Sequence, residues 1–377
     1  MNAAPKLDRD ILQNNEWNSY RLASVSLVIA IILISSFIIG LSIRPIDGNE
    51  SLVGDGTSAA RTISYTTHAP ITLLTEGAVN SSNNATTGIS WGDGSAADPY
   101  IILGWEIYAK WGTHAIEIGN FKNKYLWIMD CRAYNASNND IYIHFSSNIT
   151  VIGNNCSLSG STGIFVWMCD HPILTDNTCY SNSLQGIYIS YSKHITVEGN
   201  NCTGNIDAGL YVAWSSNITF SDNLFSSNPV GVLFSNSENC SLANNNCSKN
   251  TGYAVSIDVG SKYNRLWNNT FYHNDGTGNT YDSLNSQVYD RGTKNRWNTS
   301  GLSYNFGNYW RDMISPDTAA PFGIVDNPYK IGGGLGYKDY YPLTNVPIPP
   351  AIPEPPLMVL AIIMAALFIV IRRKGQN

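Results

Sequence analysis

The stretch GIYISYSKHITVEGNNCTGN, residues 186–205, decides the fold because variants of it precede and follow it at one fixed interval. GIFVWMCDHPILTDNTCYSN begins at residue 163, and GLYVAWSSNITFSDNLFSSN begins at residue 209, so the interval is 23 residues. In each copy an Asn stands two places before a Cys or a Phe. A repeat of this kind predicts a solenoid in which every coil packs only against its neighbours.

Apolar residues recur at three positions of the repeat and predict its interior. The first position holds Ala133, Cys156, Cys179, Cys202, Phe225, Cys247 and Phe271. The second, five residues earlier, holds Ile128, Val151, Leu174, Val197, Phe220, Leu242 and Leu266. The third holds Ile141, Ile164, Ile187, Leu210, Val232 and Val255. Alternation at period two around these residues, with Gly and Asn between the runs, indicates short strands and turns rather than helices.

One Asn per coil marks a turn, two residues before the first apolar position. This Asn ladder consists of Asn154, Asn177, Asn200, Asn223, Asn245 and Asn269. An inward Asn column can pass amide hydrogen bonds from coil to coil and so satisfy buried turn groups. We therefore predict an all-β fold, a parallel β-helix solenoid of about seven or eight coils over residues 100–275.

The segments on either side of the solenoid differ from it in composition. A polar segment, residues 44–99, precedes it, and a Gly- and aromatic-rich cap, residues 276–345, follows it. Residues 346–356 are rich in Pro and predict a stiff, extended stalk.

Two apolar runs predict transmembrane helices that flank the solenoid. Residues 22–43 contain no charged residue and, at about 1.5 Å per residue, span a hydrocarbon core of about 30 Å. A cleaved secretory signal is the alternative for this run. Residues 357–371 form the second run. Because basic residues lie in the tails 1–21 and 372–377, we predict a cell-membrane protein with both termini cytoplasmic and one large ectodomain outside.

Asn-x-Ser/Thr sequons recur along the ectodomain and suit an exported glycoprotein. The acceptor candidates outside the repeat are Asn80, Asn84 and Asn298. The formal net charge of −6 provides no electrostatic footprint for nucleic acid, which we do not expect as a partner.

Three separated segments carry a resemblance to a known family. They are GDGSAADPYIILGWEI at 92–107, GNYWRDM at 307–313 and GIVDNPYKIGGGLGYKDYYPL at 323–343. Together with the columns they resemble the right-handed parallel β-helix repeats of carbohydrate-binding proteins and sugar hydrolases, in particular the NosD-like group of exported proteins. The resemblance implies a right-handed solenoid. The group includes proteins linked to copper delivery beside lyases and hydrolases of the same architecture.

The C-terminal tail resembles a sorting signal. Pro353–Pro355 reads PEP and is followed by the second apolar run and a basic end. This order is similar to signals cut by exosortase-type transpeptidases, so the resemblance implies such an enzyme as a partner. A plain membrane anchor is the alternative.

An aromatic column is the first candidate for function. Tyr142, Phe165, Tyr188 and Tyr211 share one outward register, and Trp167 stands two residues beyond Phe165. Exposed rings along a sheet can stack against the sugar rings of a polysaccharide. The structural alternative is a cross-strand aromatic stack that stiffens the sheet.

Histidines provide a second candidate. His171 and His194 share a register on adjacent coils, and Cys169 and Asp170 precede His171. Imidazoles with a thiol or carboxylate nearby can hold copper or zinc, so His171, His194 and Cys169 are metal-site candidates. Turn positions favour polar residues in any case, which is the structural alternative.

Catalysis on sugars would need clustered carboxylates, and a lyase would add Ca²⁺ and a basic residue. Asp176 and Asp222 share a register, Glu198 lies between them, and Lys193 is near in sequence. Because acids recur at turns anyway, we name no catalytic residue. The seven cysteines are an odd count, and those of the first apolar position predict mainly free, buried thiols, with one bridge between adjacent coils left open.

The predicted function is binding or presentation of a polysaccharide or surface glycan at the cell surface without catalysis. A polysaccharide lyase or glycoside hydrolase is the first alternative, and a NosD-like copper- or metal-handling protein is the second. No cofactor is established by the sequence, and Ca²⁺ and copper are the ions these alternatives would use.

Overall fold

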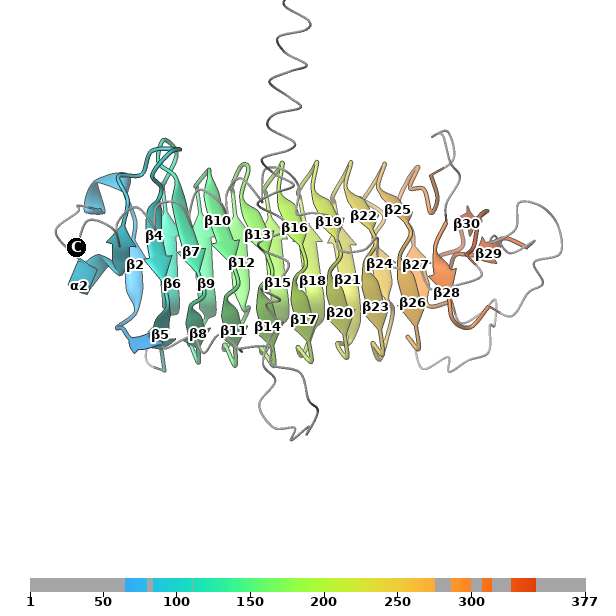
Figure 1. Ribbon diagram of the computed structural model, residues 1–377. Helices are drawn as coiled ribbons and strands as arrows, with labels where there is room; N and C mark the ends of the chain where they lie inside the picture. Colours follow the sequence, from blue (N-terminus) through green and yellow to red (C-terminus); the bar gives the residue numbers. More distant parts are fainter. Residues whose placement is uncertain are drawn as a thin grey trace, which may run out of the picture. The chain divides into compact units, whose positions relative to one another are not determined.

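The computed structural model describes residues 65–79, 84–110, 112–274, 286–299, 307–313 and 327–343. The described chain from Ser64 onward forms one compact unit, a parallel β-solenoid built from three sheets (Figure 1). Strands β4 to β24 are three per coil and so make seven complete coils, and β25, β26 and β27 continue the stack. The predicted all-β parallel solenoid is confirmed.

Each sheet takes one strand from every coil. Sheet A runs in the order β1 (Thr66–Thr67), β5 (Trp105–Tyr108), β8 (Arg132–Tyr134), β11 (Asn155–Ser157), β14 (Thr178–Tyr180), β17 (Asn201–Thr203), β20 (Leu224–Ser226), β23 (Asn246–Ser248), β26 (Thr270–Tyr272) and β28 (Tyr309–Trp310). Sheet B runs β2 (Ile71–Leu73), β6 (His114–Gly119), β9 (Asn139–His144), β12 (Ile164–Trp167), β15 (Gln185–Ser190), β18 (Ala208–Ala213), β21 (Val230–Ser235), β24 (Val255–Ile257) and β27 (Val288–Asp290). Sheet C runs β3 (Ile89–Trp91), β4 (Tyr100–Leu103), β7 (Leu126–Met129), β10 (Ile149–Ile152), β13 (Ile173–Thr175), β16 (Thr196–Glu198), β19 (Thr219–Ser221), β22 (Ser241–Ala243) and β25 (Arg265–Trp267).

The remaining described elements are short. An antiparallel pair, β29 (Tyr329–Lys330) and β30 (Lys338–Asp339), lies at the C-terminal end. Two helices, η1 (Glu76–Ala78) and α2 (Asn84–Thr87), lie in the N-terminal part.

The three apolar positions of the repeat form the three inner faces of the solenoid. Cys156 pairs with Cys179 in sheet A, Val151 pairs with Leu174 in sheet C, and Ile164 pairs with Ile187 in sheet B. All of these side chains are fully buried. Equivalent residues 23 apart are therefore direct strand partners, and the perimeter of one coil sets the period.

The Asn ladder runs through the buried turn between sheets C and A. The Asn177 amide Nδ2 donates to Asn200 Oδ1 at 2.9 Å, and the Asn177 backbone N–H donates to the same oxygen at 2.9 Å. Asn200 repeats both bonds to Asn223, and the series continues to Asn308 at the last coil. Each Asn also donates to a strand carbonyl, as Asn200 does to Leu174 O at 2.9 Å. The ladder thus satisfies interior turn groups that water cannot reach.

A second amide ladder, which the sequence analysis missed, lies between sheets A and B. Its members repeat the same bonds from coil to coil and end on Gln287. They are Asn182, Asn205, Asn228, Asn250 and Asn274. Their Nδ2 groups need the room that glycine leaves on sheet B, because a Cβ at Gly186 would lie 2.9 Å from Asn205 Nδ2.

The seven cysteines are all free and buried. Three of them, Cys156, Cys179 and Cys202, are consecutive partners in sheet A and fill the interior as small apolar side chains. The expectation of mainly free thiols agrees with this arrangement.

Buried aromatic residues close the C-terminal end of the stack. Trp310 stacks on Tyr329 with ring centroids 3.8 Å apart, and its indole Nε1 donates to Asp339 at 3.0 Å. Trp297 is buried beside them and donates to Asp290 at 2.9 Å. These rings pack on the last coil that the structure describes and bury its inner side chains.

The structure corrects the predicted membrane segments. None of the helices among the described residues is long and apolar enough to cross a membrane. The predicted spans, residues 22–43 and 357–371, and the cytoplasmic tails, 1–21 and 372–377, lie outside the described residues, as does the stalk 346–356. Among the described residues the fold is therefore a solenoid with no flanking transmembrane helix, and the membrane-anchored topology predicted from the two apolar runs is not carried further.

The solenoid begins earlier than residue 100. Strands β1 and β2 pair in parallel with β5 and β6, and β3 pairs antiparallel with β4. These first strands are two or three residues long. They are also not spaced at the period of the repeat, since Ile71 pairs with Ile116, 45 residues later, so periodicity did not reveal them.

The Asn ladder generates a stability prediction. Replacing Asn200 by Ala leaves the buried Asn177 N–H without its partner, which costs about 1–3 kcal/mol, and also removes the bonds of the Asn200 side chain to the Asn177 amide, Leu174 O and Asn223 Oδ1. We expect the free energy of unfolding to fall by about 3 kcal/mol or more in thermal or urea unfolding. Asn201→Ala, one residue along and half-buried, is the matched control and should cost far less. Equal losses for the two variants would contradict the ladder's role.

Candidate functional site

The predicted aromatic column is a mutual stack of rings on sheet B. Tyr142 and Phe165 have ring centroids 5.1 Å apart, Phe165 and Tyr188 4.6 Å, and Tyr188 and Tyr211 4.8 Å. The last two pairs are within 7° of parallel. Because each ring face is covered by the next ring, the half-buried column presents ring edges to solvent. This arrangement favours the structural alternative, a cross-strand stack.

Trp167 does not belong to that stack. Its ring lies 4.7 Å from the ring of Phe145 and is tilted by 59° to it. Phe145 follows β9, so the pair joins the end of one strand to the strand of the next coil.

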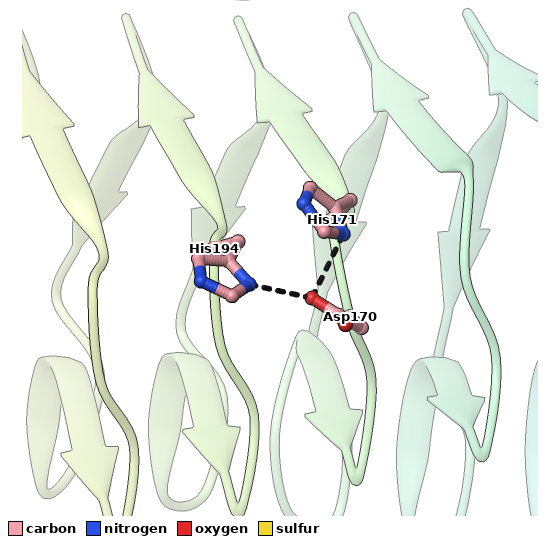
Figure 2. Close-up of side chains that lie close together, drawn as sticks. All are labelled: Asp170, His171 and His194. Carbon is pink, nitrogen blue, oxygen red and sulfur yellow. Dashed lines mark hydrogen bonds and ion pairs between the residues drawn. The ribbon is translucent and has the colours of Figure 1, made fainter.

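Asp170, His171 and His194 meet where the chain passes from sheet B to sheet C (Figure 2). His171 Nδ1 lies 2.8 Å from Asp170 Oδ1, and His194 Nδ1 lies 2.9 Å from the same oxygen. The two imidazole rings are stacked, with centroids 4.7 Å apart. Among the described residues, this is the one group of three or more His, Cys, Asp or Glu whose ligand atoms all lie within 4.8 Å of one another.

The charge around Asp170 keeps its carboxyl group ionised. Burial alone would raise the pKa of Asp170, but the hydrogen bond from His194 and the charges of His171 and Lys193 hold that pKa below its ordinary value. Lys193 Nζ lies 3.5 Å from Asp170 Oδ2. The carboxylate is thus shared by two imidazoles and one ammonium group, all of them partly exposed.

Cys169 does not join this group. Its side chain is 3% exposed, and its thiol donates to the carbonyls of Ile143 and Trp167 inside the coil. Burial raises the pKa of Cys169 to about 12, so it is a neutral thiol. The predicted ligand set of His171, His194 and Cys169 is therefore corrected to Asp170, His171 and His194. The spacing of the repeat predicted the right turn, but the direction of each side chain depends on the turn geometry.

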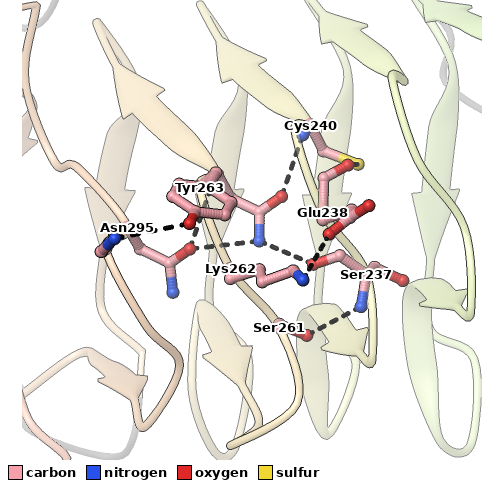
Figure 3. A network of polar contacts seen from close by, with 9 residues as sticks. Ser237, Glu238, Cys240, Ser261, Lys262, Tyr263 and Asn295 are labelled. Carbon is pink, nitrogen blue, oxygen red and sulfur yellow. Dashed lines mark hydrogen bonds and ion pairs between the residues drawn. The ribbon is translucent and has the colours of Figure 1, made fainter.

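The equivalent turn further along the solenoid, around Glu238 and Lys262, shows which features of the Asp170 turn recur in other coils (Figure 3). Asp170 and Lys193 occupy a column that continues as Ser216, Glu238 and Lys262. Lys262 Nζ lies 3.0 Å from Glu238 Oε2, so an ion pair between adjacent coils recurs in this column. The residues that follow these two in sequence are Asn239 and Tyr263. The imidazole pair therefore distinguishes the Asp170 turn, while the ion pair does not.

Asp176, Glu198 and Asp222, the carboxyl groups considered for catalysis, lie at the ends of neighbouring sheet C strands. Burial raises the pKa of all three, and Asp222 and Asp176 further raise the pKa of Glu198 by repulsion. Lys193, the basic residue considered with them, is instead paired with Asp170. The three carboxyl groups and Lys193 therefore do not form the cluster that the catalytic interpretation considered.

The three glycosylation candidates lie in different surroundings. Asn80 lies outside the described residues, and Asn84 begins α2. Asn298 is only 6% exposed and lines an open cavity of about 510 Å³ with Arg296, Lys338 and Tyr340. A buried acceptor does not suit glycosylation, so the expectation for Asn298 is corrected.

One set of exposed residues was missed by the sequence analysis. Met168, Tyr191 and Trp214 stand directly after β12, β15 and β18, and all three side chains are exposed. They occupy one place in the three quoted copies of the repeat, which is the signal that would have found them.

Comparison with known proteins now defines the family. Residues 109–314, more than half of the chain, match the family model described as periplasmic copper-binding protein (NosD). The chain belongs to the NosD family. No curated protein matches it in sequence.

Several solved structures match this NosD-family chain at low identity. The mannuronan C-5 epimerase AlgE4 A-module of Azotobacter vinelandii is 16% identical, with 48% of this chain and 64% of that one covered and a TM-score of 0.39. Pectate lyase Pel9A is 13% identical, with 66% and 75% covered and a TM-score of 0.43. The enzymatically active domain of bacteriophage CBA120 tailspike protein 2 is 12% identical, with 60% and 42% covered and a TM-score of 0.43. The chain spans less than two thirds of the length of the epimerase module, and these likenesses carry no inference about activity.

A buried carboxyl group generates a pH prediction. Asp140 in β9 is fully buried, its Oδ1 accepts from the Ala136 N–H at 3.3 Å, and its Oδ2 has no hydrogen-bond partner among the described residues. Burial raises the pKa of Asp140 well above its ordinary value. The folded state therefore favours the protonated form, so the full stability is present below the unfolded pKa of about 3.9 and falls as the pH rises towards the folded pKa.

We expect Asp140→Asn to remove this dependence. At pH 7 the variant should unfold at a higher temperature than the wild type, and the difference should shrink to near zero at about pH 4. Thermal unfolding followed by circular dichroism from pH 4 to pH 8 measures it. A difference that stays constant across this range would show that ionisation of Asp140 is not its cause.

Proposed function

We propose that the chain binds copper at its surface through Asp170, His171 and His194. The family description supports copper as the metal, and the three side chains supply the donors. Two imidazole nitrogens and a carboxylate oxygen suit Cu(II), whereas the softer Cu(I) prefers sulfur ligands. The observation that carries the proposal is the convergence of both Nδ1 atoms on one carboxylate oxygen.

The geometry of the donors fits a metal ion. Ligands at about 2.0–2.1 Å from a metal and at right angles to each other lie about 2.8–3.0 Å apart. The two nitrogen–oxygen distances are 2.8 and 2.9 Å, so a copper ion could replace the present hydrogen bonds with small side-chain movements. Partial exposure of both rings leaves a path for the ion from solvent.

Lys193 opposes binding. Its ammonium group already neutralises part of the Asp170 charge and would lie beside a bound cation. This feature supports exchange of copper with a partner rather than permanent storage, because a repelled ion leaves more readily.

Non-catalytic glycan binding is our second proposal. The stacked column of Tyr142 to Tyr211 offers ring edges and is a poor platform for sugars. Met168, Tyr191 and Trp214, which are exposed at the neighbouring corner of the same coils, support the proposal better.

Asparagine substitutions test the copper site without disturbing the turn. Asn occupies the His column at Asn148 and Asn217, with φ of 57° and 55°, so His171→Asn and His194→Asn fit the backbone. We expect each to weaken Cu(II) binding by about tenfold or more, measured by isothermal titration and by electron paramagnetic resonance of bound Cu(II). Glu238→Gln, in the equivalent turn without imidazoles, is the control and should leave Cu(II) affinity unchanged.

Lys193→Ser tests the opposing charge. Ser occupies this column at Ser147 and Ser216, so the turn should keep its conformation. We expect tighter Cu(II) binding than in the wild type, because the competing ammonium group is gone. Unchanged spectra and affinities in His171→Asn and His194→Asn would refute the site whatever the result for Lys193→Ser.

A further inference from the structure

Bulky residues occupy a backbone position that favours asparagine. The position follows each sheet B strand. In five successive coils, from Asn120 to Trp214, its N–H donates to the last carbonyl of the next strand, and in the sixth the Asn236 N–H donates to Asp258 Oδ1. Its occupants in six successive coils are Asn120, Phe145, Met168, Tyr191, Trp214 and Asn236. Their φ values are all positive, from 48° to 58°. In this left-handed region Asn is common, while large side chains are strained.

The two Asn residues stand at the ends of the column, so the turn does not require a bulky side chain. Four coils in the middle nevertheless carry Phe, Met, Tyr and Trp. Phe145 is half-buried against Trp167, at 4.7 Å between ring centroids, and this contact accounts for it. The other three are exposed, and among the described residues the one ring contact in this set is between Tyr191 and Trp214 themselves.

Met168, Tyr191 and Trp214 form an exposed strip, which we call the aromatic corner. Their side chains are 42%, 51% and 54% exposed, respectively. The rings of Tyr191 and Trp214 are parallel to within 3°, with centroids 5.9 Å apart. The positive φ strains the backbone, and the exposed side chains leave apolar surface in contact with water. Backbone strain and exposed apolar patches are both found mainly at functional sites.

We infer that the aromatic corner binds a linear, uncharged polysaccharide that lies along the solenoid axis. Equivalent residues on successive coils are separated by about 4.8 Å and project in the same direction. A polymer with a repeat of similar length can therefore contact each coil in the same way. The strip is more exposed than the half-buried stack on sheet B, so a sugar can pack its apolar C–H face against the exposed surface of these side chains and keep its hydroxyl groups at the edge.

Polar groups flank the strip. Two residues beyond the corner, successive coils present Asp170, Lys193 and Ser216, which can exchange hydrogen bonds with hydroxyl groups. Asp170 and Lys193 pair with each other, so this edge has little net charge to attract an acidic polymer. The uncharged character of the ligand follows from that pairing.

The experiment uses Tyr191→Asn and Trp214→Asn, singly and combined, because Asn is the residue of the same column at positions 120 and 236. Affinity electrophoresis in gels containing hydroxyethyl cellulose or glucomannan should retard the wild type. The affinity of the double variant for the polysaccharide should be lower by about tenfold or more. Since Asn fits the backbone, the variants should unfold at the same or a higher temperature, so lost binding cannot be attributed to misfolding.

Tyr263→Asn is the matched control. Tyr263 is an exposed aromatic residue with φ of 59°, but it stands in the column of His171, on another part of the turn. It should bind both polysaccharides as the wild type does. Equal retardation of the wild type and the double variant would overturn the inference, as would no retardation of the wild type by either polymer.

Two other outcomes would also overturn it. Retardation by alginate alone would show an acidic ligand, and a dimer that dissociates in the double variant, seen by analytical ultracentrifugation, would show that the strip pairs with a second copy. The inference gives residues to the second proposal and is independent of copper. Run with EDTA, His171→Asn should keep wild-type polysaccharide binding, whereas the copper site could fail its own test without affecting this one.

Discussion

Amide hydrogen bonding between coils is the constraint on which the solenoid depends. Each coil turns corners in the interior, where backbone groups cannot reach water, and every unpaired group there would cost about 1–3 kcal/mol. The side chain of Asn bonds to both neighbouring coils, because its oxygen accepts a hydrogen bond from the coil before it and its nitrogen donates one to the coil after it. Two such ladders hold two of the turns.

The ladders also fix the register. A slip of one residue would separate each Asn from its partners and turn every inward side chain outward. Residues one period apart are consequently held as direct neighbours, and chemistry on the surface is built by repetition. His171 and His194 come within 4.7 Å of each other for this reason, although neither turn alone carries a site.

Much of this architecture could be predicted from the sequence, because translation by one coil maps each residue onto its neighbour. The inner columns and the first Asn ladder follow from that operation alone. The second ladder could have been found in the same way, since Asn205 stands five residues after Asn200 just as Asn182 stands five after Asn177. The direction of side chains within a turn could not. Cys169 and Asp170 are adjacent in sequence, but the turn buries the thiol and directs the carboxylate to the imidazoles. The sequence pattern likewise could not show that the rings on sheet B stack face to face and expose their edges.

Comparison of equivalent turn positions along the repeat indicates which residues the fold does not require. In the His column, Asn148, Asn217 and Asn239 show what the left-handed turn prefers, and His171 and His194 depart from it. In the corner column, Asn120 and Asn236 show the same preference, and Met168, Tyr191 and Trp214 depart from it. The two departures overlap on two central coils, which carry Met168 with His171 and Tyr191 with His194. In the His column Asn148 precedes them and Asn217 and Asn239 follow, before Tyr263 departs again. A scaffold that repeats one solution to its turns has no structural reason to change it twice in one place, and consistent local rules are broken mainly where function requires it. The central coils are therefore where we place both proposed binding sites, and the flanking coils hold those coils in register.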